Sequence, residues 1–195
     1  MKKYIIMSLL IVVVCTSCKN EIKKDVETAT KELKPAQKVF EQINVDKSLT
    51  VILEPKGKRT SKGTVYFVQN GDMVTLKAKV KGLTTGMHAI HIHEKADCSS
   101  PDGKSAGGHW NPTFEDHGKW GSKEGFHKGD IGNFMVGEDG TGGIKMTSDA
   151  WCIGCDDETK NIVGKAIIIH QGEDDFTSQP SGAAGARVSC GGIIK

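Results

Sequence analysis

From Leu49 onward, apolar residues tend to recur at every second position of this 195-residue chain, and this period restricts the fold more than any other feature. Between Val74 and Val80, apolar side chains alternate with threonine and lysine, as in a half-buried strand with a lysine-rich outer face. Gly63–Val68 has the composition of a second strand, and Gln69–Asp72 is typical of a hairpin turn between them. No segment of about twelve residues keeps a helical period. The pattern predicts an all-β protein.

Further strand candidates follow toward the C-terminus. Phe134–Val136 and Ile144–Met146 flank a turn at Glu138–Thr141, which predicts a second hairpin. Ile162–His170 is rich in β-branched residues and is expected to form a buried strand. Several short strands separated by turns indicate an antiparallel β-sandwich or a flattened barrel.

The first residues have the pattern of an export signal. Met1–Lys3 is basic and Tyr4–Val14 is apolar, but this run is too short to span a bilayer comfortably. Small residues before Cys18 resemble a bacterial lipoprotein cleavage box, which predicts a signal peptide over residues 1–17 and a lipid on Cys18. An ordinary cleaved signal peptide is the alternative. The lipoprotein signal and the ordinary signal peptide both predict export into an oxidising space. The lipoprotein signal also predicts a lipid anchor to a membrane of the bacterial cell envelope, in the periplasm or at the outer-membrane face.

Residues 18–47 are rich in lysine, acidic residues and threonine, so we expect a flexible charged tether before a folded domain at 48–195. Without residues 1–17, the chain has 24 basic and 24 acidic residues. This balance argues against a nucleic-acid partner, for which a basic stripe would be expected. No strand face is distinctively apolar, so the sequence leaves both a homodimer and a monomer open.

Histidine is concentrated in one part of the chain. The seven histidines are His88, His91, His93, His109, His117, His127 and His170. His91 and His93 are two residues apart on one expected strand and therefore share a face. Residues 94–133 and 171–187 are Gly-rich, and loops of this length are usually functional. A single histidine is more often structural, but this clustering favours a metal site. Imidazole is a suitable ligand for copper and zinc. The loop histidines His109, His117 and His127 could enclose a zinc ion together with Asp130.

Several motifs follow one another in this region: Gly86–His93, then Ala106–Pro112, His117–Gly118 and His127–Asp130, and then Gly164–His170 with Asp174 and Gly185–Gly191. In composition and order they resemble, respectively, the copper strand, the zinc loop and the C-terminal part of the copper/zinc superoxide dismutases. The resemblance covers about residues 48–195, and the export signal makes the chain similar to exported bacterial lipoprotein members. It implies an antiparallel Greek-key β-sandwich or flattened barrel with two long functional loops.

The resemblance also implies a role for individual side chains. Copper would bind His91, His93, His109 and His170. Zinc would bind His109, His117, His127 and Asp130, so His109 would be shared by both ions and would take part in catalysis. Asp174 would connect His91 to His117 behind the metals. His88 would brace the copper strand, and Arg187 would attract the substrate anion at the mouth of the copper site.

The activity implied by the resemblance is the dismutation of superoxide into dioxygen and hydrogen peroxide, with copper as the redox ion and zinc structural. The alternative is a surface lipoprotein that binds and buffers the two metals without catalysis. Arg187 favours the enzyme, because a metal buffer does not need an arginine at an open copper. Lys95, Lys119 and Lys128 are candidates, by position only, for further positive charge near the substrate.

The expected domain has four cysteines, Cys98, Cys152, Cys155 and Cys190. The resemblance implies a Cys98–Cys190 disulfide. Cys152 and Cys155 are additional to the family pattern, and a small local disulfide, a redox pair or half of a zinc site are the alternatives. Ala89 stands where the family commonly has glycine, so its methyl group is expected to crowd the packing behind the copper strand.

Overall fold

The computed structural model describes residues 46–195. The expected signal peptide, the lipidation candidate Cys18 and most of the expected tether lie outside the described residues. The described elements are β1 (Lys47–Pro55), β2 (Lys62–Asn70), β3 (Met73–Lys81), β4 (Gly86–His93), the short 3-10 helix η1 (Lys104–Ala106), β5 (Gly132–Val136), β6 (Thr141–Ser148), β7 (Ala166–His170) and β8 (Arg187–Gly192). β1 thus begins at the last residue of the expected tether. No helix in this part of the chain is long and apolar enough to cross a membrane.

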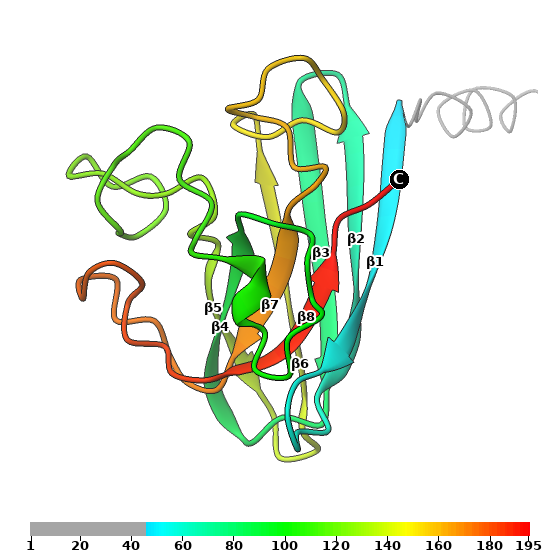
Figure 1. Ribbon diagram of the computed structural model, residues 1–195, viewed down its shortest axis with the longest axis vertical. Coiled ribbons are helices and arrows are strands. Elements are labelled where there is room, and N and C mark those ends of the chain that lie inside the picture. The colour runs from blue at the N-terminus through cyan, green and yellow to red at the C-terminus, as the bar shows by residue number, and fades with distance from the viewer. Residues whose placement is uncertain (1–45) are drawn as a thin grey trace, which may run out of the picture. The chain divides into compact units, whose positions relative to one another are not determined.

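The eight strands close into a barrel in the order β1-β2-β3-β6-β5-β4-β7-β8 (Figure 1). All neighbouring strands pair antiparallel. The chain crosses from β3 to β4 and from β6 to β7 instead of adding each strand beside the last, which is Greek-key connectivity. The predicted all-β antiparallel fold is therefore confirmed, and closure of the barrel removes free sheet edges.

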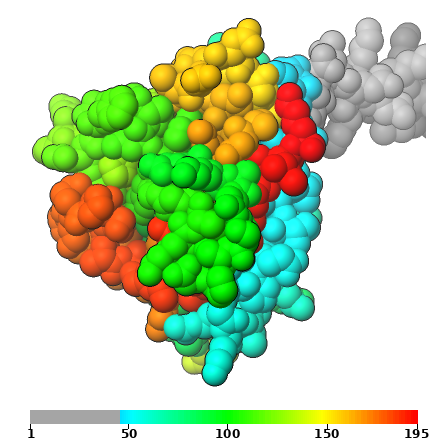
Figure 2. Space-filling view, in the orientation of Figure 1, coloured from blue at the N-terminus to red at the C-terminus, as the bar shows by residue number. Residues whose placement is uncertain are grey.

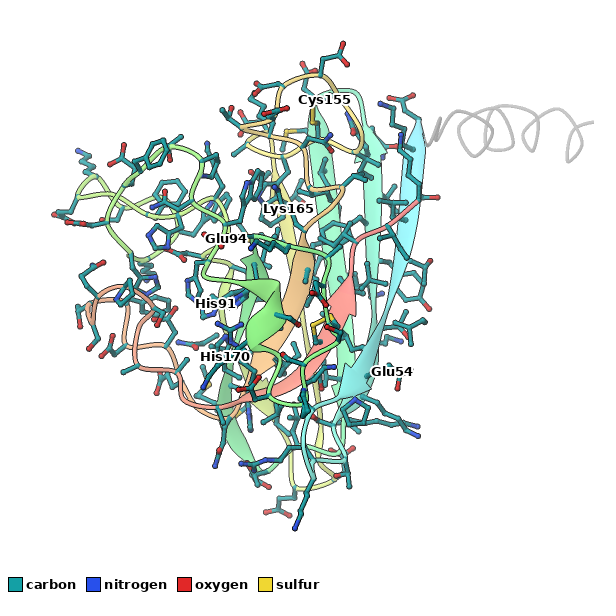
Figure 3. All side chains as sticks on the ribbon, viewed as in Figure 1. Glu54, His91, Glu94, Cys155, Lys165 and His170 are labelled. Carbon is teal, nitrogen blue, oxygen red and sulfur yellow. A yellow bond between two sulfur atoms is a disulfide. The ribbon has the colours of Figure 1, made fainter. Side chains whose placement is uncertain are left out.

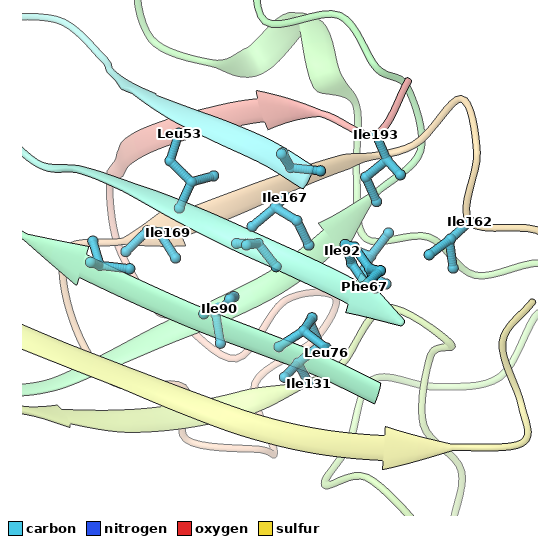
Figure 4. Close-up of a cluster of buried hydrophobic side chains, with 14 of the residues drawn as sticks. Leu53, Phe67, Leu76, Ile90, Ile92, Ile131, Ile162, Ile167, Ile169 and Ile193 are labelled. Carbon is cyan, nitrogen blue, oxygen red and sulfur yellow. The ribbon is translucent and has the colours of Figure 1, made fainter. Parts of the chain in front are cut away.

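The period of two in β4 determines which side chains fill the barrel. Ile90 and Ile92 are fully buried and pack with Phe67 and other apolar residues of the core (Figure 4). Because side chains alternate along a strand, His91 and His93 lie on the other face of β4, outside the barrel. Their exposed fractions are nevertheless only 0% and 1%, since loops cover this face.

Two long loops provide this cover. Residues 94–131 connect β4 to β5, residues 171–186 connect β7 to β8, and parts of both lie next to each other on one side of the molecule (Figure 2). A Cys98–Cys190 disulfide attaches the first loop to β8. A second disulfide, Cys152–Cys155, closes a small ring in the loop between β6 and β7, so the structure contains the local bridge rather than a free thiol pair.

The strand predicted at Ile162–His170 is wrong at its beginning. β7 starts at Ala166, because Gly164 has a φ of 87° and the Lys165 N–H donates to the carbonyl of Ile162 (3.3 Å), which makes a turn. Ile162 is still fully buried in the core. Its β-branched side chain therefore indicated burial correctly, but burial here does not require strand geometry.

Candidate metal centre

Four histidines converge on the outer face of the barrel. His91 and His93 come from β4, His170 ends β7, and His109 of the first loop pairs with His93 through an isolated antiparallel bridge. One ring nitrogen of each histidine lies within 4.8 Å of those of the others. Figure 3 shows the side chains of His91 and His170 close together where the strands meet the loops. We call these four residues the four-histidine cluster.

Hydrogen bonds determine which nitrogen two of these rings present. Nδ1 of His93 donates to the carbonyl of Gly107 (3.0 Å), and Nδ1 of His170 donates to the carbonyl of Gly185 (3.3 Å). Each ring therefore presents Nε2 to the cluster, and these two nitrogens are 3.4 Å apart. Carbonyl partners of this kind fix the tautomer and orientation of metal-binding histidines.

A second cluster lies beside the first and consists of His109, His117, His127 and Asp130, again with ligand atoms within 4.8 Å of one another. The Asp130 carboxylate is 2.8 Å from Nδ1 of His109, 3.0 Å from Nδ1 of His117 and 3.2 Å from Nδ1 of His127. Its Oδ2 also accepts backbone N–H groups from Gly118 (3.2 Å) and His127 (2.8 Å), which hold it in place. We call this the Asp130 cluster, and three imidazoles with one carboxylate suit zinc.

His109 belongs to both clusters. Its Nδ1 lies against Asp130, while its ring centre is 4.0 Å from that of His91 and 5.0 Å from that of His93. Its Nε2 is buried and has no hydrogen-bond partner. One imidazole therefore presents a nitrogen to each cluster, as a ring that bridges two metal ions must.

Asp174 connects the two clusters from the second loop. Its Oδ2 accepts from Nε2 of His91 (2.8 Å) and its Oδ1 accepts from Nε2 of His117 (2.9 Å). Both rings consequently turn Nδ1 toward the clusters. The Asn133 side chain fixes the Asp174 backbone, accepting from its N–H (2.9 Å) and donating to its carbonyl (2.8 Å). Gly182 lies so close that a Cβ there would collide with the Asp174 carboxylate.

The sequence reasoning missed Asn133, Gly182 and Gln179. Gln179 accepts from the backbone N–H of His117 (2.9 Å) and donates to its carbonyl (2.8 Å). These two contacts join residues 62 positions apart, and the Asn133 contacts span 41 positions. No short-range pattern in the chain signals such pairs.

Two other residues of β4 lie next to the clusters without joining them. His88 donates from Nδ1 to the carbonyl of His170 (2.9 Å), and its Nε2 is 3.2 Å from the Thr84 hydroxyl. Ala89 is fully buried, pairs with Asn133 in β5 and donates its N–H to a carbonyl of the second loop. β4 therefore keeps a regular register with a methyl group at this position.

The donor set fits metal ions. Four ring nitrogens are buried without a hydrogen-bond partner, and they are Nδ1 of His91, Nε2 of His109, Nδ1 of His117 and Nδ1 of His127. The last two lie close to Asp130 but are not aligned for hydrogen bonds. A buried polar atom without a partner costs about 1–3 kcal/mol. Cations bound in the two clusters would give each of these atoms a partner, since imidazole nitrogen is a preferred ligand of copper and zinc.

Burial favours the neutral form of three rings in the four-histidine cluster, those of His93, His109 and His170. Burial lowers the pKa of His109 to about 4, although Asp130 opposes this shift. Burial and the neighbouring imidazoles hold the pKa of His93 and of His170 well below 6.5. Neutral imidazole binds a metal ion through its unprotonated nitrogen, so His93 and His170 can bind without losing a proton, whereas His109 must lose its N–H proton to bind at both nitrogens.

The Asp130 cluster carries charge instead. Burial disfavours protonation of His117, but the carboxylates of Asp130 and Asp174 outweigh it and raise the pKa of His117 to about 9. Burial would raise the pKa of each carboxyl group, yet the imidazole contacts hold both values below the ordinary one. A metal ion that binds here at neutral pH must therefore displace a proton.

Arg187 lies beside the four-histidine cluster. It begins β8 as the cross-strand partner of His170, and its guanidinium donates to the carbonyl of Gly103 (2.8 Å). Its positive charge contributes to the lowered pKa of His93 and of His170. Arg187 lines a hollow of about 510 Å³, to which three further cationic residues contribute: Lys56, Arg59 and Lys104. Lys95, Lys119 and Lys128 are not among its lining residues.

The fold and the two clusters define a class of protein: a closed Greek-key barrel that carries two buried clusters of potential metal ligands joined by one histidine. Comparison with known families agrees, since the model of the copper/zinc superoxide dismutase family matches residues 61–193. The chain belongs to this family, and the metals of the family are copper and zinc.

Several known proteins are similar to this chain. Copper-zinc superoxide dismutase 2 from Mesembryanthemum crystallinum is 34% identical over 156 residues, which cover 76% of this chain and 95% of that protein. The extracellular copper-zinc superoxide dismutase from Brugia pahangi is 34% identical over 139 residues, or 66% of this chain and 67% of that protein.

Solved structures give the same result for the fold. A double mutant of a superoxide-dismutase-like protein from Bacillus subtilis, with a tyrosine and a proline each changed to histidine, superimposes with a TM-score of 0.67 and 32% identity, covering 75% of this chain and 97% of the other. The clock protein EA4 gives a TM-score of 0.65 and 30% identity, covering 75% and 94%.

Proposed function

We propose that this protein is a superoxide dismutase, which converts two superoxide anions and two protons into dioxygen and hydrogen peroxide. Membership of the family supports this proposal. The observation that carries it is the position of Arg187, directly paired with His170 of the four-histidine cluster. A protein that only stored metal ions would not need a fixed cation at this point.

Copper in the four-histidine cluster would supply reversible one-electron chemistry, and zinc in the Asp130 cluster would be structural. The residues of the chain perform the other tasks. Arg187 attracts and orients the small anion, because its guanidinium is rigid and always charged. Asp174 and Asp130 hold the imidazole rings in the required orientations. Nε2 of His109 faces the four-histidine cluster and is buried without a hydrogen-bond partner, so it is placed to hold a metal ion or a proton beside the product.

The test is to measure the metal content of the purified protein together with its rate of superoxide consumption, before and after addition of copper. We expect one copper and one zinc per chain, with activity that follows the copper content. Tight binding of both metals without turnover would contradict the proposal and would favour the alternative, a copper- and zinc-buffering protein.

We also propose that the protein is exported and held by a lipid on Cys18, with residues 1–17 removed and residues 18–47 acting as a tether for the domain at 48–195. Two disulfides within residues 46–195 and a relative named as extracellular support export. Growth with radiolabelled palmitate tests the anchor, since label should appear in the protein and be lost in Cys18→Ala. Label that persists in Cys18→Ala would contradict it.

A further inference from the structure

A groove with lysine walls lies on the outer face of β2, β3 and β6, and none of the candidate metal ligands lines it. Its volume is about 660 Å³, and five lysines line it: Lys62, Lys77, Lys79, Lys81 and Lys145. No carboxylate lines it. Among residues 46–195, no hydrogen-bond acceptor or carboxylate partner is found for the ammonium groups of these lysines. The positive charge of this lysine groove is therefore uncompensated within the described domain.

The strand register brings these like charges together. Lys62 is the cross-strand partner of Lys81, and Lys77 is the partner of Lys145. Lys79 lies between the two pairs on β3, about 7 Å along the strand from Lys77 and from Lys81. Like charges directly opposite each other destabilise a sheet. An anion bound between them would remove this repulsion.

Backbone forms the floor of the groove. A Cβ at Gly63 would collide with the carbonyl of Lys79, and a Cβ at Gly143 would collide with the carbonyl of Ala78. These two glycines allow the strands to approach closely. Because they have no side chains, the bottom of the groove is formed by backbone and the lysine side chains flank it. Thr64 is a further lining residue, and its hydroxyl can hydrogen-bond a polar ligand.

We propose that the lysine groove binds an extended acidic polysaccharide, with the lysine ammonium groups paired to its anionic substituents. A chain-like polymer fits a recessed groove that crosses three strands, whereas the flat surface of a bilayer would meet only the lysine tips. Tyr66, the partner of Lys77 on β2, is 45% exposed and offers an aromatic face to a sugar ring beside the lysines.

The position of the groove keeps the metal centre accessible. In the closed barrel, β3 is four strands from β7 in either direction, so the groove and His170 lie on opposite sides. Figure 1 shows β2 and β3 on the side of the barrel away from the two long loops. A polymer in the groove would therefore hold the protein on an anionic matrix while His170 and the strands beside it face away.

The test uses the purified protein and fluorescent alginate oligosaccharides, with neutral dextran as the control polymer. We expect saturable binding to alginate that weakens when sodium chloride rises from about 50 mM to about 200 mM, because counter-ions are released on binding. In the triple variant Lys77→Gln, Lys79→Gln, Lys145→Gln, the dissociation constant should rise about tenfold or more, and its salt dependence should become shallower.

A matched variant removes the same charge elsewhere: Lys58→Gln, Lys123→Gln, Lys160→Gln. It should bind alginate almost as well as the unchanged protein, and both triple variants should retain their metal content and far-ultraviolet circular dichroism. Equal weakening in the two variants would show that only net charge matters and would overturn the proposal. Absence of alginate binding, or tighter binding to phosphatidylglycerol vesicles than to alginate, would overturn it as well.

Discussion

At the scale of single residues, the two arginines of the chain can be separated by function. Arg59 and Arg187 line the same hollow, but only Arg187 is paired with His170. Arg187→Ala should leave both metals bound, since the arginine is not a member of either cluster. It should slow superoxide turnover about 10- to 100-fold and weaken its dependence on ionic strength, because attraction of the anion is lost.

The matched control is Arg59→Ala, which removes the same charge from the same hollow and should have a smaller effect, because Arg59 is not paired with His170. Pulse radiolysis over a range of salt concentrations measures both rates. A turnover rate in Arg187→Ala equal to that of the unchanged protein would refute the docking role of Arg187.

A single glycine also controls the metal centre. In Gly182→Ala, the new methyl group would displace the Asp174 carboxylate and lie 2.7 Å from Nε2 of His117. Loss of the Asp174 contacts should weaken metal retention about 10- to 100-fold, as measured by competition with a chelator. Gly71→Ala is the control, because Gly71 has a similar positive φ of 55° but open space around it. Equal metal retention in both variants would contradict this explanation.

At the scale of elements, the two disulfides should differ in their contribution to stability. Cys98–Cys190 spans 92 residues and Cys152–Cys155 spans three. On the chain-entropy model, replacing the first pair by serine should lower the free energy of unfolding by about 4–5 kcal/mol, and replacing the second pair by about 2 kcal/mol. Urea titration of the metal-loaded proteins measures both values.

The long disulfide also helps to position Arg187. It attaches loop 94–131, which contains the Gly103 carbonyl that accepts from Arg187, to β8. The Cys98→Ser, Cys190→Ser variant should therefore also lose turnover rate, while the Cys152→Ser, Cys155→Ser variant should keep it. The opposite order of stability or of activity would contradict this assignment.

The elements also show how far sequence reasoning extends. Alternation predicted the strands that became β2 and β3, because one face of each is buried and the other is exposed. The β-branched composition of Ile162–His170 misplaced the start of β7, because Ile162 is buried in a turn that contains Gly164. The metal clusters were visible as histidine spacing and as a resemblance. Asn133, Gln179 and Gly182 were not visible, since each acts through a contact that forms only when the second loop folds against β5, the first loop or itself.

At the scale of the whole molecule, the shifted histidines predict how the stability of the metal-free protein depends on pH. Below pH 6.5, the unfolded chain binds protons that His93, His109 and His170 do not accept when folded, because burial lowers the pKa of each. Stability must therefore fall as the pH decreases from 6.5. Near pH 4 and below, the unfolded carboxyl groups of Asp130 and Asp174 also bind protons that their folded forms resist, which adds to the loss.

Above pH 6.5 the sign reverses through His117. Its pKa is raised to about 9 in the folded state, so its stabilisation is complete below 6.5 and is lost as the pH rises toward 9. Metal-free protein should therefore have its highest melting temperature near pH 6.5, with lower values at pH 5 and at pH 9. Copper and zinc should remove the alkaline decline, since the metal replaces the proton between His117 and the carboxylates. Scanning calorimetry with and without metals measures this, and a melting temperature of the metal-free protein that still rises from pH 6.5 to pH 9 would show that His117 does not hold the proton.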